Sequence, residues 1–523
     1  MQHIIRILSF ISFLTSISGQ SSSNITLLGQ TMTDDVRYSG SWAYTAPDST
    51  EYALIGARTG LAIFPIDNPN DMPLLDFIPG PSTNWREVTV IGQHAFVVTD
   101  VSDVGHTMQV IDLSPLPDSV NLITEYNTTF TKGHIIQKDI YNESPYVYVN
   151  GTEETDGVHI LDITDPTNPI EVGLYQPGYY IHDCHVRDTL LFACAFFESK
   201  VDILSIANKT NPTLIGTIGY DGANSHSCFT SIDGNYLFVC DELDGLPARI
   251  FDISDLSDPK EVASYSANLE SLVHNPYIRG DYTFIAHNTE GLRVVDIADP
   301  ELPIEVGHYD TWDQESGGFN GLWSACPFFP SGKIIGANRH DGLYVWEFNN
   351  TQAARIYGKV YEQATGTAIA NANVQLTTND TILLTDIFGN FKYGMLAGNY
   401  EIIVEEAGFE PFMVNIDLNE GDSIWIDIPL TQEGVNAVNA PQSDIDMEVF
   451  PNPFTDFIEL NWSGNAAIHS FSIYDGGGQL VAQRMLPTNG IRFETNDWSA
   501  GVYTIVAIND HQRVLFKEIL VKK

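Results

Sequence analysis

The sequence predicts an all-β protein: a seven-bladed β-propeller followed by two small β-sandwich domains. One segment is repeated almost unchanged, as GVHILDITDPTNPIEVGLY from Gly157 and as GLRVVDIADPELPIEVGHY from Gly291, with apolar residues at every second position. Its strand pattern occurs seven times, at spacings of 43 to 51 residues, which is typical of a four-stranded propeller blade. Near Asn349 the repeat ends, and further strands and turns follow.

Residues 1–19 have the composition of a secretory signal peptide, with Arg6, an apolar run from Ile7 to Leu14, and the small residues Ser16 and Ser18. No other run of about 18 apolar residues occurs, so we expect an exported chain with no transmembrane segment. The net charge is −44, from 68 acidic and 24 basic residues, and such a surface disfavours nucleic-acid binding.

Residues 24–349 hold the predicted propeller. Most repeats contain two strands joined by a tight turn, a third strand, an Asp-Pro or Asn-Pro turn, and an outer strand. The seventh repeat lacks an outer strand, whereas the chain begins with an unpaired strand, ITLLGQ from Ile25. We therefore expect this strand to close the ring by pairing with the last blade, which removes an exposed sheet edge.

The third strands end at equivalent positions. Because an Asp recurs there in four blades, it is interpreted as a residue that stabilises the following turn by an Asx-type hydrogen bond, and not as a catalytic residue. The seven residues at this position are Pro65, Asp112, Asp162, Ser205, Asp252, Asp296 and Glu347.

Residues 354–431 alternate strands with Gly and Asn turns and predict the first sandwich. Residues 432–446 are polar and are interpreted as a linker, and residues 447–523 are again strand and turn. Asp386, Gly389 and Asn390 lie in one turn. A structural calcium ion there would need six to eight oxygen ligands, so a hairpin turn is the favoured interpretation.

Three segments resemble known families. The repeats, with HDCHV from His182 and GFNGLWSACPFFPSGK from Gly318, resemble the LVIVD-repeat propellers of the choice-of-anchor B family. The segment with IYGKVYE from Ile356 and LAGNYEIIV after it resembles the carboxypeptidase regulatory-like domain. The tail, with VFPNPFTDFIEL from Val449 and WSAGVYTIVAI from Trp498, is similar to the type A sorting domain of type IX secretion.

The tail resemblance implies a Bacteroidota-type bacterium, Sec export, and passage through the outer membrane by the type IX machinery, whose sortase removes the tail. The mature protein would then lie on the outer cell surface, attached to lipopolysaccharide, or be released into the medium. None of the three resemblances implies a reaction for the propeller.

Side chains at the starts of the inner strands are expected around one mouth of the central channel, together with those of the second-to-third connections, because both kinds of loop emerge on the same face. The candidates for ligand binding are Trp42, Arg86, His134, His182, Asp183, His226, His274, Asn275, His287, Trp323 and His340. The second-to-third connections also carry Arg58, Asn150, Asp241, Glu242, Asn288, Asn338 and Arg339.

Of these, His182, His226 and His274 are candidate ligands of a transition metal such as zinc or copper. The alternative is that these side chains hydrogen-bond backbone groups where the inner strands crowd the axis. Cys184 and Cys194 flank one hairpin, and Cys228 and Cys240 flank the next. Disulfides within each hairpin or between the two hairpins, and unpaired buried thiols, are the alternatives.

Two hypotheses of function follow. The first is a non-enzymatic binding protein that recognises a protein or a glycan with the channel mouth. The second is an extracellular, metal-dependent enzyme that uses His182, Asp183, His226 and His274. The chain has no nucleophile elbow, phosphate loop or dinucleotide fingerprint, so no catalytic residue is assigned.

Overall fold

The computed structural model describes residues 21–102, 107–220, 222, 224–376, 382–433, 445–464, 468–476, 478–485, 490–509 and 514–523. The predicted signal peptide lies outside these residues, as do residues 434–444 of the predicted linker. The chain divides into two compact units, Met1–Ala353 and Ala354–Lys523. Among the described residues, no helix has the length and apolar character needed to cross a membrane.

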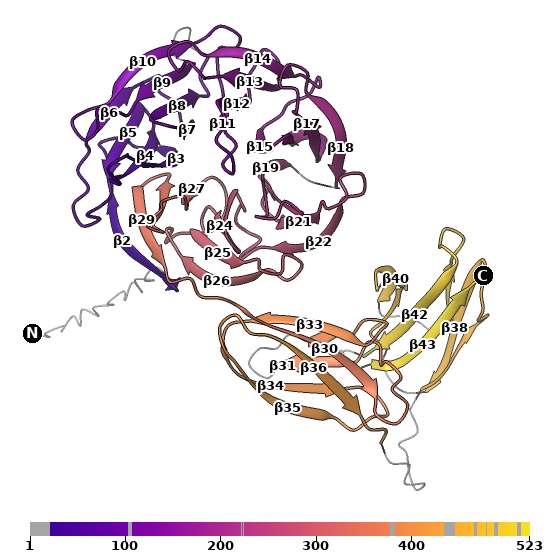
Figure 1. The fold of residues 1–523 in the computed structure, drawn as a ribbon. Coiled ribbons are helices and arrows are strands. Elements are labelled where there is room, and N and C mark those ends of the chain that lie inside the picture. Colours follow the sequence, from indigo (N-terminus) through magenta and orange to yellow (C-terminus); the bar gives the residue numbers. More distant parts are fainter. Residues whose placement is uncertain are drawn as a thin grey trace, which may run out of the picture. The chain divides into compact units, whose positions relative to one another are not determined.

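The first unit is a ring of antiparallel sheets around a central axis (Figure 1). In the described residues it has seven blades, which confirms the predicted propeller. The inner strands are β3 (Tyr38–Thr45), β7 (Arg86–Ile91), β11 (Ile135–Gln137), β15 (Asp183–Arg187), β19 (Ser225–Thr230), β23 (Asn275–Arg279) and β27 (Leu322–Cys326). The second strands are β4 (Glu51–Ala57), β8 (His94–Thr99), β12 (Tyr146–Asn150), β16 (Leu190–Ala195), β20 (Tyr236–Asp241), β24 (Tyr282–Ala286) and β28 (Ile334–Asn338).

The seven copies of the repeated pattern form the third strands, as predicted. They are β5 (Gly60–Pro65), β9 (Met108–Asp112), β13 (Val158–Asp162), β17 (Lys200–Ser205), β21 (Ala248–Asp252), β25 (Leu292–Asp296) and β29 (Gly342–Phe348). The outer strands are β6 (Asp76–Pro79), β10 (Asn121–Tyr126), β14 (Ile170–Tyr175), β18 (Thr213–Gly219), β22 (Lys260–Tyr265), β26 (Ile304–Tyr309) and, in the seventh blade, β2 (Ile25–Thr31). A short 3-10 helix, η1 (Phe196–Glu198), joins β16 to β17.

Ring closure follows the prediction. Strand β2 pairs antiparallel with β29, with Ile25 opposite Phe348 and Thr31 opposite Leu343. The preceding strand β1 (Ser22–Ser23) adds an unpredicted fifth strand to the sixth blade by pairing with β26. Strands β1 and β2 therefore connect the sixth blade to the seventh.

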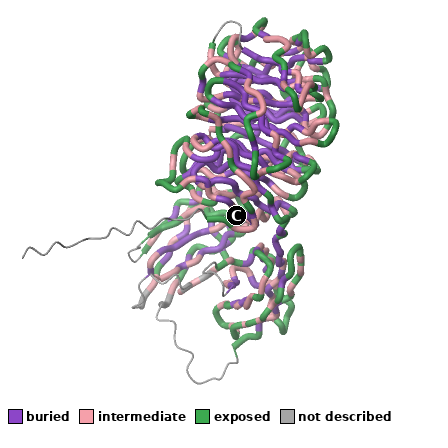
Figure 2. The backbone as a smooth tube through the Cα atoms, turned by 90° about the vertical axis from the view of Figure 1, so that its left-hand side faces the viewer, coloured by how far each residue is buried: buried purple, intermediate pink, exposed green. Residues whose placement is uncertain are grey.

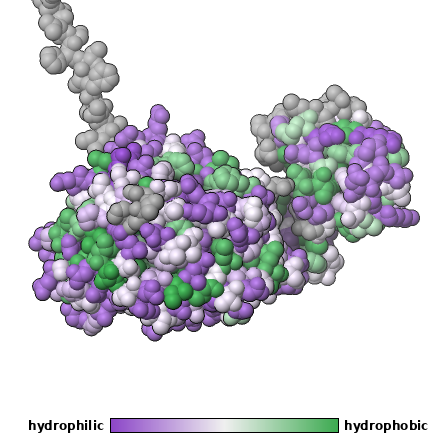
Figure 3. Space-filling model, turned by 90° about the horizontal axis from the view of Figure 1, so that it is seen from above, coloured by the Kyte–Doolittle hydropathy of each residue, from purple (hydrophilic) through white to green (hydrophobic). Residues whose placement is uncertain are grey.

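The core of the propeller lies between neighbouring blades. Phe192 and Val201 of the fourth blade pack in one buried cluster with Cys228 and Leu237 of the fifth. Figure 2 shows buried residues concentrated in the strands and exposed ones in the turns. In Figure 3, hydrophilic and neutral residues cover most of the visible face of this unit, and hydrophobic residues form small scattered groups. Each blade is therefore stabilised by the apolar faces of its neighbours, at about 1.5–3 kcal/mol for each large side chain buried.

The recurring Gly at the start of the third strand has a steric cause. A Cβ atom on Gly157 would lie 2.0 Å from the carbonyl oxygen of Tyr175, and one on Gly291 would lie 2.2 Å from that of Tyr309. Gly291 also has a φ of +73°, which side chains disfavour. The outer strand can approach this closely only if glycine occupies the position.

The recurring Asp residues form the predicted turns. The Oδ1 atoms of Asp112, Asp162, Asp252 and Asp296 accept hydrogen bonds of 2.8–2.9 Å from the backbone N–H two residues later. Their role in every one of these blades is structural.

The second unit contains two sandwiches. In the first, one sheet has the order β33 (Asn390–Met395), β30 (Ala354–Glu362), β36 (Ser423–Leu430), and the other β32 (Ile382–Leu384), β31 (Asn373–Leu376), β34 (Gly398–Glu405), β35 (Phe412–Leu418). In the second, the sheets are β37 (Ile445–Phe450), β38 (Phe457–Gly464), β41 (Ile491–Glu494) and β40 (Leu480–Met485), β39 (Ser470–Tyr474), β42 (Gly501–Ile508), β43 (Val514–Lys522). Strand β37 begins at Ile445, inside the predicted linker.

The predicted disulfides within hairpins are wrong. Cys184 faces Ala193 across its hairpin, and Cys194 is the next residue, so the two thiols point to opposite faces of the sheet. Cys228 and Cys240 are related in the same way, because Cys228 faces Val239. Cys194 and Cys228 instead share the core between two blades. All five thiols are unpaired and buried.

We expect Ile25→Ala to lower the free energy of unfolding by about 2–4 kcal/mol, because Ile25 is buried in the closing strand. Thr26→Ala, in the same strand but exposed, should change it by no more than about 0.5 kcal/mol. Chemical denaturation measures both. Equal effects of the two substitutions would show that β2 does not contribute to the closed ring.

We also expect oxidation to link Cys194 to Cys228 and no other cysteines, because these two thiols contact each other across neighbouring blades. Peptide mapping under non-reducing conditions after copper–phenanthroline treatment measures this, with Cys194→Ser as the control. A Cys184–Cys194 peptide would contradict the assignment.

Candidate functional site

Four imidazoles follow one another around the channel mouth, and we call them the imidazole arc: His134, His182, His226 and His274. Neighbouring ring centroids are 4.5, 4.2 and 4.2 Å apart, and the indole of Trp323 continues the arc 4.1 Å from His274. Each imidazole lies at or immediately before the start of an inner strand. The structure thus places side by side residues that are separated by 44 to 49 positions in the chain.

Hydrogen bonds between blades orient three of these rings. The Nδ1 atoms of His182, His226 and His274 donate to the backbone carbonyls of His226, His274 and Trp323, at 3.2, 3.1 and 3.1 Å. Because a carbonyl only accepts, Nδ1 carries the proton, and Nε2 of a neutral ring is then an acceptor. The predicted backbone bonding therefore occurs, but it uses only one nitrogen of each imidazole.

Glu242 faces the remaining nitrogens. Its Oε1 atom lies 3.7 Å from Nε2 of His226 and 3.5 Å from Nε2 of His274. His182, His226 and Glu242 each offer one ligand atom, and the three atoms lie within 4.8 Å of one another. Glu242 belongs to a second-to-third connection, so its presence at the mouth was foreseeable, but its convergence with two histidines was not.

A polar layer lies next to the arc. Glu87, Gln137, Asp183, Ser227 and Asn275 line one small cavity inside the channel. Oδ1 of Asp183 accepts hydrogen bonds from Gln137 at 3.0 Å and from the backbone N–H of Cys184 at 2.6 Å. The carboxylates of Glu87 and Asp183 come from the second and fourth blades.

Burial shifts the protonation of this layer and of the arc. It raises the pKa of Glu87 to about 8, with a smaller upward contribution from Asp183 and a downward one from the hydrogen bond of the Trp323 indole. Burial also raises the pKa of Asp183 to about 7. It lowers the pKa of His182 and of His226 well below their ordinary value, and the neighbouring imidazoles add to this. His182 and His226 are therefore neutral near pH 7, and the two carboxyls hold protons readily.

Trp42 was predicted to lie at the channel mouth, but the structure places it elsewhere. The inner strand of the first blade begins at Tyr38, so Trp42 lies further along the channel. Its ring centroid is 6.2 Å from that of Tyr277 and 5.8 Å from that of Phe328. Phe229 joins the same cluster. Because these rings come from different blades and contact one another, they fill the channel at that level.

Four other predicted residues have structural contacts. The Arg86 side chain is fully buried and donates to the carbonyls of Ala57 and Pro81. Asn275 donates to the carbonyl of Trp323 at 3.2 Å. His287 is buried against Ser266 and Ala267, and burial lowers its pKa to about 4. His340 contacts Arg37.

An aromatic rim surrounds the mouth, and sequence reasoning missed most of it. Beside Trp323, the guanidinium of Arg339 lies 4.5 Å from the Trp323 ring centroid and 5.5 Å from that of Trp85. Nε and Nη1 of Arg339 are buried without a hydrogen-bond partner among the described residues. Phe196 contacts His182, and Phe197, which packs against Phe196, is 73% exposed. We call Trp85, Tyr180, Phe196, Phe197, Phe319, Trp323 and Arg339 the aromatic rim.

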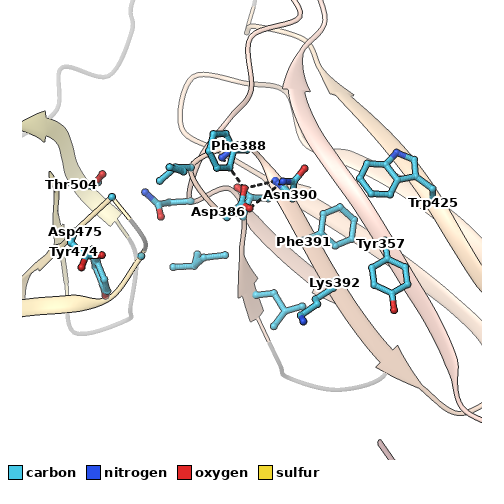
Figure 4. Close-up of a pocket in the computed structure, with 17 residues that line it drawn as sticks. Tyr357, Asp386, Phe388, Asn390, Phe391, Lys392, Trp425, Tyr474, Asp475 and Thr504 are labelled. Carbon is cyan, nitrogen blue, oxygen red and sulfur yellow. Dashed lines mark hydrogen bonds between the residues drawn. The ribbon is translucent and has the colours of Figure 1, made fainter. Parts of the chain in front are cut away.

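The turn considered for calcium lies in the second unit. Oδ1 of Asp386 accepts hydrogen bonds from the backbone N–H groups of Phe388 and Asn390, and Oδ2 accepts one from the Asn390 amide (Figure 4). Both oxygens therefore stabilise the turn itself, which supports the hairpin interpretation.

Comparisons with known families agree with the three resemblances. A family model for the LVIVD repeat matches residues 143–176, 226–267 and 275–311. A model for the carboxypeptidase regulatory-like domain matches residues 355–431, and one for the secretion system C-terminal sorting domain matches residues 448–522. The chain carries these elements in the predicted order, and the sorting domain indicates export to the cell surface or the medium.

No curated protein matches the chain. Solved structures with some likeness include a putative 6-phosphogluconolactonase from Bacteroides uniformis, at 12% identity and a TM-score of 0.46, covering 69% of this chain and all of that one. A putative 6-phosphogluconolactonase from Bacteroides fragilis has 13% identity and a TM-score of 0.42, covering 57% and 97%. The periplasmic gluconolactonase of Pseudomonas aeruginosa has 12% identity and a TM-score of 0.42, covering 57% and 100%.

We expect Glu87→Gln to weaken the loss of stability with rising pH. The folded protein holds the Glu87 proton up to about pH 8, whereas the unfolded chain releases it near its ordinary pKa of 4.5. The stability contributed by this group is therefore lost as pH rises through that window. Thermal unfolding between about pH 5 and pH 8 measures the slope for both proteins.

The change of stability with pH in Glu87→Gln must be compared with that of the wild-type protein, because other buried groups also contribute to it. Asp183 acts in the same direction as Glu87, whereas His182 and His226 act in the opposite one because their pKa values are lowered. Glu143→Gln, at an exposed position, is the control and should leave the slope unchanged. A Glu87→Gln slope equal to that of the wild type would contradict the expectation.

Proposed function

We propose that this chain is an exported, non-enzymatic binding protein whose propeller holds a glycan at the channel mouth. The observation that carries the proposal is the guanidinium of Arg339. It lies against the rings of Trp85 and Trp323, and two of its nitrogen atoms are buried with no partner among the described residues. Because unpartnered buried donors are unfavourable, they are better explained by a ligand that accepts from them.

The rest of the aromatic rim supports a sugar ligand. Phe197 and Phe319 are 73% and 46% exposed, although each belongs to a group of contacting rings. The apolar face of a sugar ring packs on such side chains, while its hydroxyl groups need polar partners beside them. The imidazole arc and Arg339 supply those partners at the same mouth.

The local charge favours acidic sugars over neutral ones. Burial lowers the pKa of Arg339 to about 10, the nearby charge of Arg37 adds to this, and Glu242 acts in the opposite direction. A carboxylate can accept two parallel hydrogen bonds from a guanidinium, which is a strong and directional contact. In a chain of net charge −44, two neighbouring arginines at the channel mouth would favour an acidic ligand over a neutral one.

Export defines where this binding would occur. The sorting domain of residues 448–522 indicates the cell surface or the medium. We propose that the regulatory-like sandwich spaces the propeller from this tail. Attachment to surface lipopolysaccharide and removal of the tail by the secretion system's sortase are parts of the same proposal.

A metal-dependent extracellular enzyme is the second candidate function. The observation that favours it is the convergence of His182, His226 and Glu242 beside Asp183 and Glu87. Burial brings the pKa values of these two carboxyls to about 7 and about 8, a range suited to proton transfer. Turnover of a bound glycan by the purified protein would favour this function over simple binding.

We expect Phe197→Ala to weaken glycan binding about tenfold, which corresponds to about 1.4 kcal/mol. The physical reason is the loss of an exposed ring on which a sugar can pack. A glycan array identifies the ligand, and calorimetry measures its affinity. Leu214→Ala is the control, because Leu214 is also exposed in the fourth blade but lies on the outer strand.

Arg339→Lys should also weaken binding, because lysine keeps the charge and loses the planar donor pair. Equal binding by Phe197→Ala, Leu214→Ala and the wild type would overturn the proposed mouth site. Failure of every glycan on the array, with capture of a protein partner by the same mouth, would replace glycan with protein as the ligand.

A further inference from the structure

Three acceptor atoms face one another at the channel mouth. Nδ1 of His182 and of His226 carries a proton, because each donates to a backbone carbonyl. One ring nitrogen of each histidine and one carboxylate oxygen of Glu242 lie within 4.8 Å of one another, and Nε2 is the nitrogen of each ring that does not donate to a backbone carbonyl. Two lone pairs and a carboxylate charge therefore share one small volume.

This arrangement is unfavourable without a cation. The Nε2 atom of His226 and Oε1 of Glu242 are 3.7 Å apart, beyond hydrogen-bond distance, and both are acceptors when the imidazole is neutral. A water molecule could donate to two of the atoms. A divalent cation interacts favourably with all three at once and also neutralises the carboxylate.

His274 provides the independent observation. It is only 1% exposed, and its Nε2 atom has no hydrogen-bond partner among the described residues. That atom lies 3.5 Å from Oε1 of Glu242, so it points to the same place. A buried imidazole nitrogen without a donor needs a partner, which a water molecule or a bound ion can supply, and the position beside Glu242 favours an ion here.

We propose that His182, His226 and Glu242 bind one divalent transition-metal ion of the zinc class at the channel mouth. His274 lies beside the site as a fourth ligand or as an acceptor for a metal-bound water. This site shares the imidazole arc with the proposed glycan site but includes none of the aromatic rim, so substitutions in the rim test the two proposals separately.

The donor set and its spacing suit zinc. Two imidazoles and one carboxylate are ligands that zinc prefers, whereas calcium and magnesium favour sites made of oxygen alone. In a tetrahedral zinc site with bonds of about 2.0–2.1 Å, neighbouring ligand atoms are about 3.3 Å apart. The separation of 3.7 Å between His226 and Glu242 needs only a small contraction, whereas the His182 nitrogen, within 4.8 Å of the other two ligand atoms, has further to move.

The backbone hydrogen bonds would act as the outer shell of this site. A metal-binding histidine usually donates its other N–H to a carbonyl or carboxylate, which fixes the tautomer and the ring orientation. His182 and His226 already do so toward the neighbouring blade. The fold therefore fixes the orientation of both imidazole rings before a metal binds.

The test uses the mature chain without a His tag, stripped of metal by a chelator. Titration with Zn²⁺ by calorimetry should show one site per chain, and Co²⁺ should give the visible absorption of a tetrahedral ion. We expect His226→Asn and Glu242→Gln each to weaken Zn²⁺ binding at least tenfold. Both keep a polar group of similar size, and circular dichroism checks that the variants fold.

The matched control is His308→Asn. His308 also has a carboxylate neighbour, Glu305 at 3.1 Å, but the pair lies on the outer strand β26, away from the channel. It should leave the affinity unchanged. If His226→Asn does not fold, Glu242→Gln carries the test, because Glu242 lies in a connection and is 12% exposed.

Three results would overturn the proposal: no stoichiometric zinc, an affinity unchanged in both site variants, or an equal loss in His308→Asn. None of them affects the glycan-binding proposal, since these titrations contain no glycan. Loss of glycan binding in Phe197→Ala with zinc binding intact would show in turn that the aromatic rim serves the glycan and not the metal.

Discussion

The structure depends on the antiparallel pairing of β2 with β29, which joins the outer strand of the seventh blade, from the start of the propeller sequence, to the third strand of that blade, from its end. Without this pairing the seventh blade would lack its outer strand, and the edge of β29 would be unpaired. Ring closure also sets the distance between neighbouring inner strands. The hydrogen bonds from His182, His226 and His274 to the next blade exist only at that distance.

A division of labour follows from the repeat. The most regular residues of the repeat determine the backbone geometry of each blade. Gly157 and Gly291 allow close approach of the outer strand, and the recurring Asp residues stabilise turns. The least regular residues, at the inner-strand starts and the second-to-third connections, lie around the channel. The fold gathers them by symmetry, although no two neighbours in the arc are near each other in the chain.

Prediction from the sequence succeeded wherever a local pattern carried the information. Alternation at period two, the spacing of the repeats and the unpaired Ile25 strand sufficed for the blade count and the ring closure. It failed where side-chain direction mattered. The hairpin disulfides were wrong because adjacent strand residues face opposite sides, and Trp42 was misplaced because the first inner strand begins four residues earlier than assumed.

The sequence by itself determined the all-β fold, the seven blades and the sorting domain, because periodic patterns or contiguous motifs predict each of them. Only the tertiary structure decided how the channel mouth is built. His226 meets a backbone carbonyl and His274 meets Glu242 only because a neighbouring blade supplies the partner, and Arg339 meets Trp85 only because the ring is closed. These contacts join residues far apart in the chain, and no local pattern encodes them.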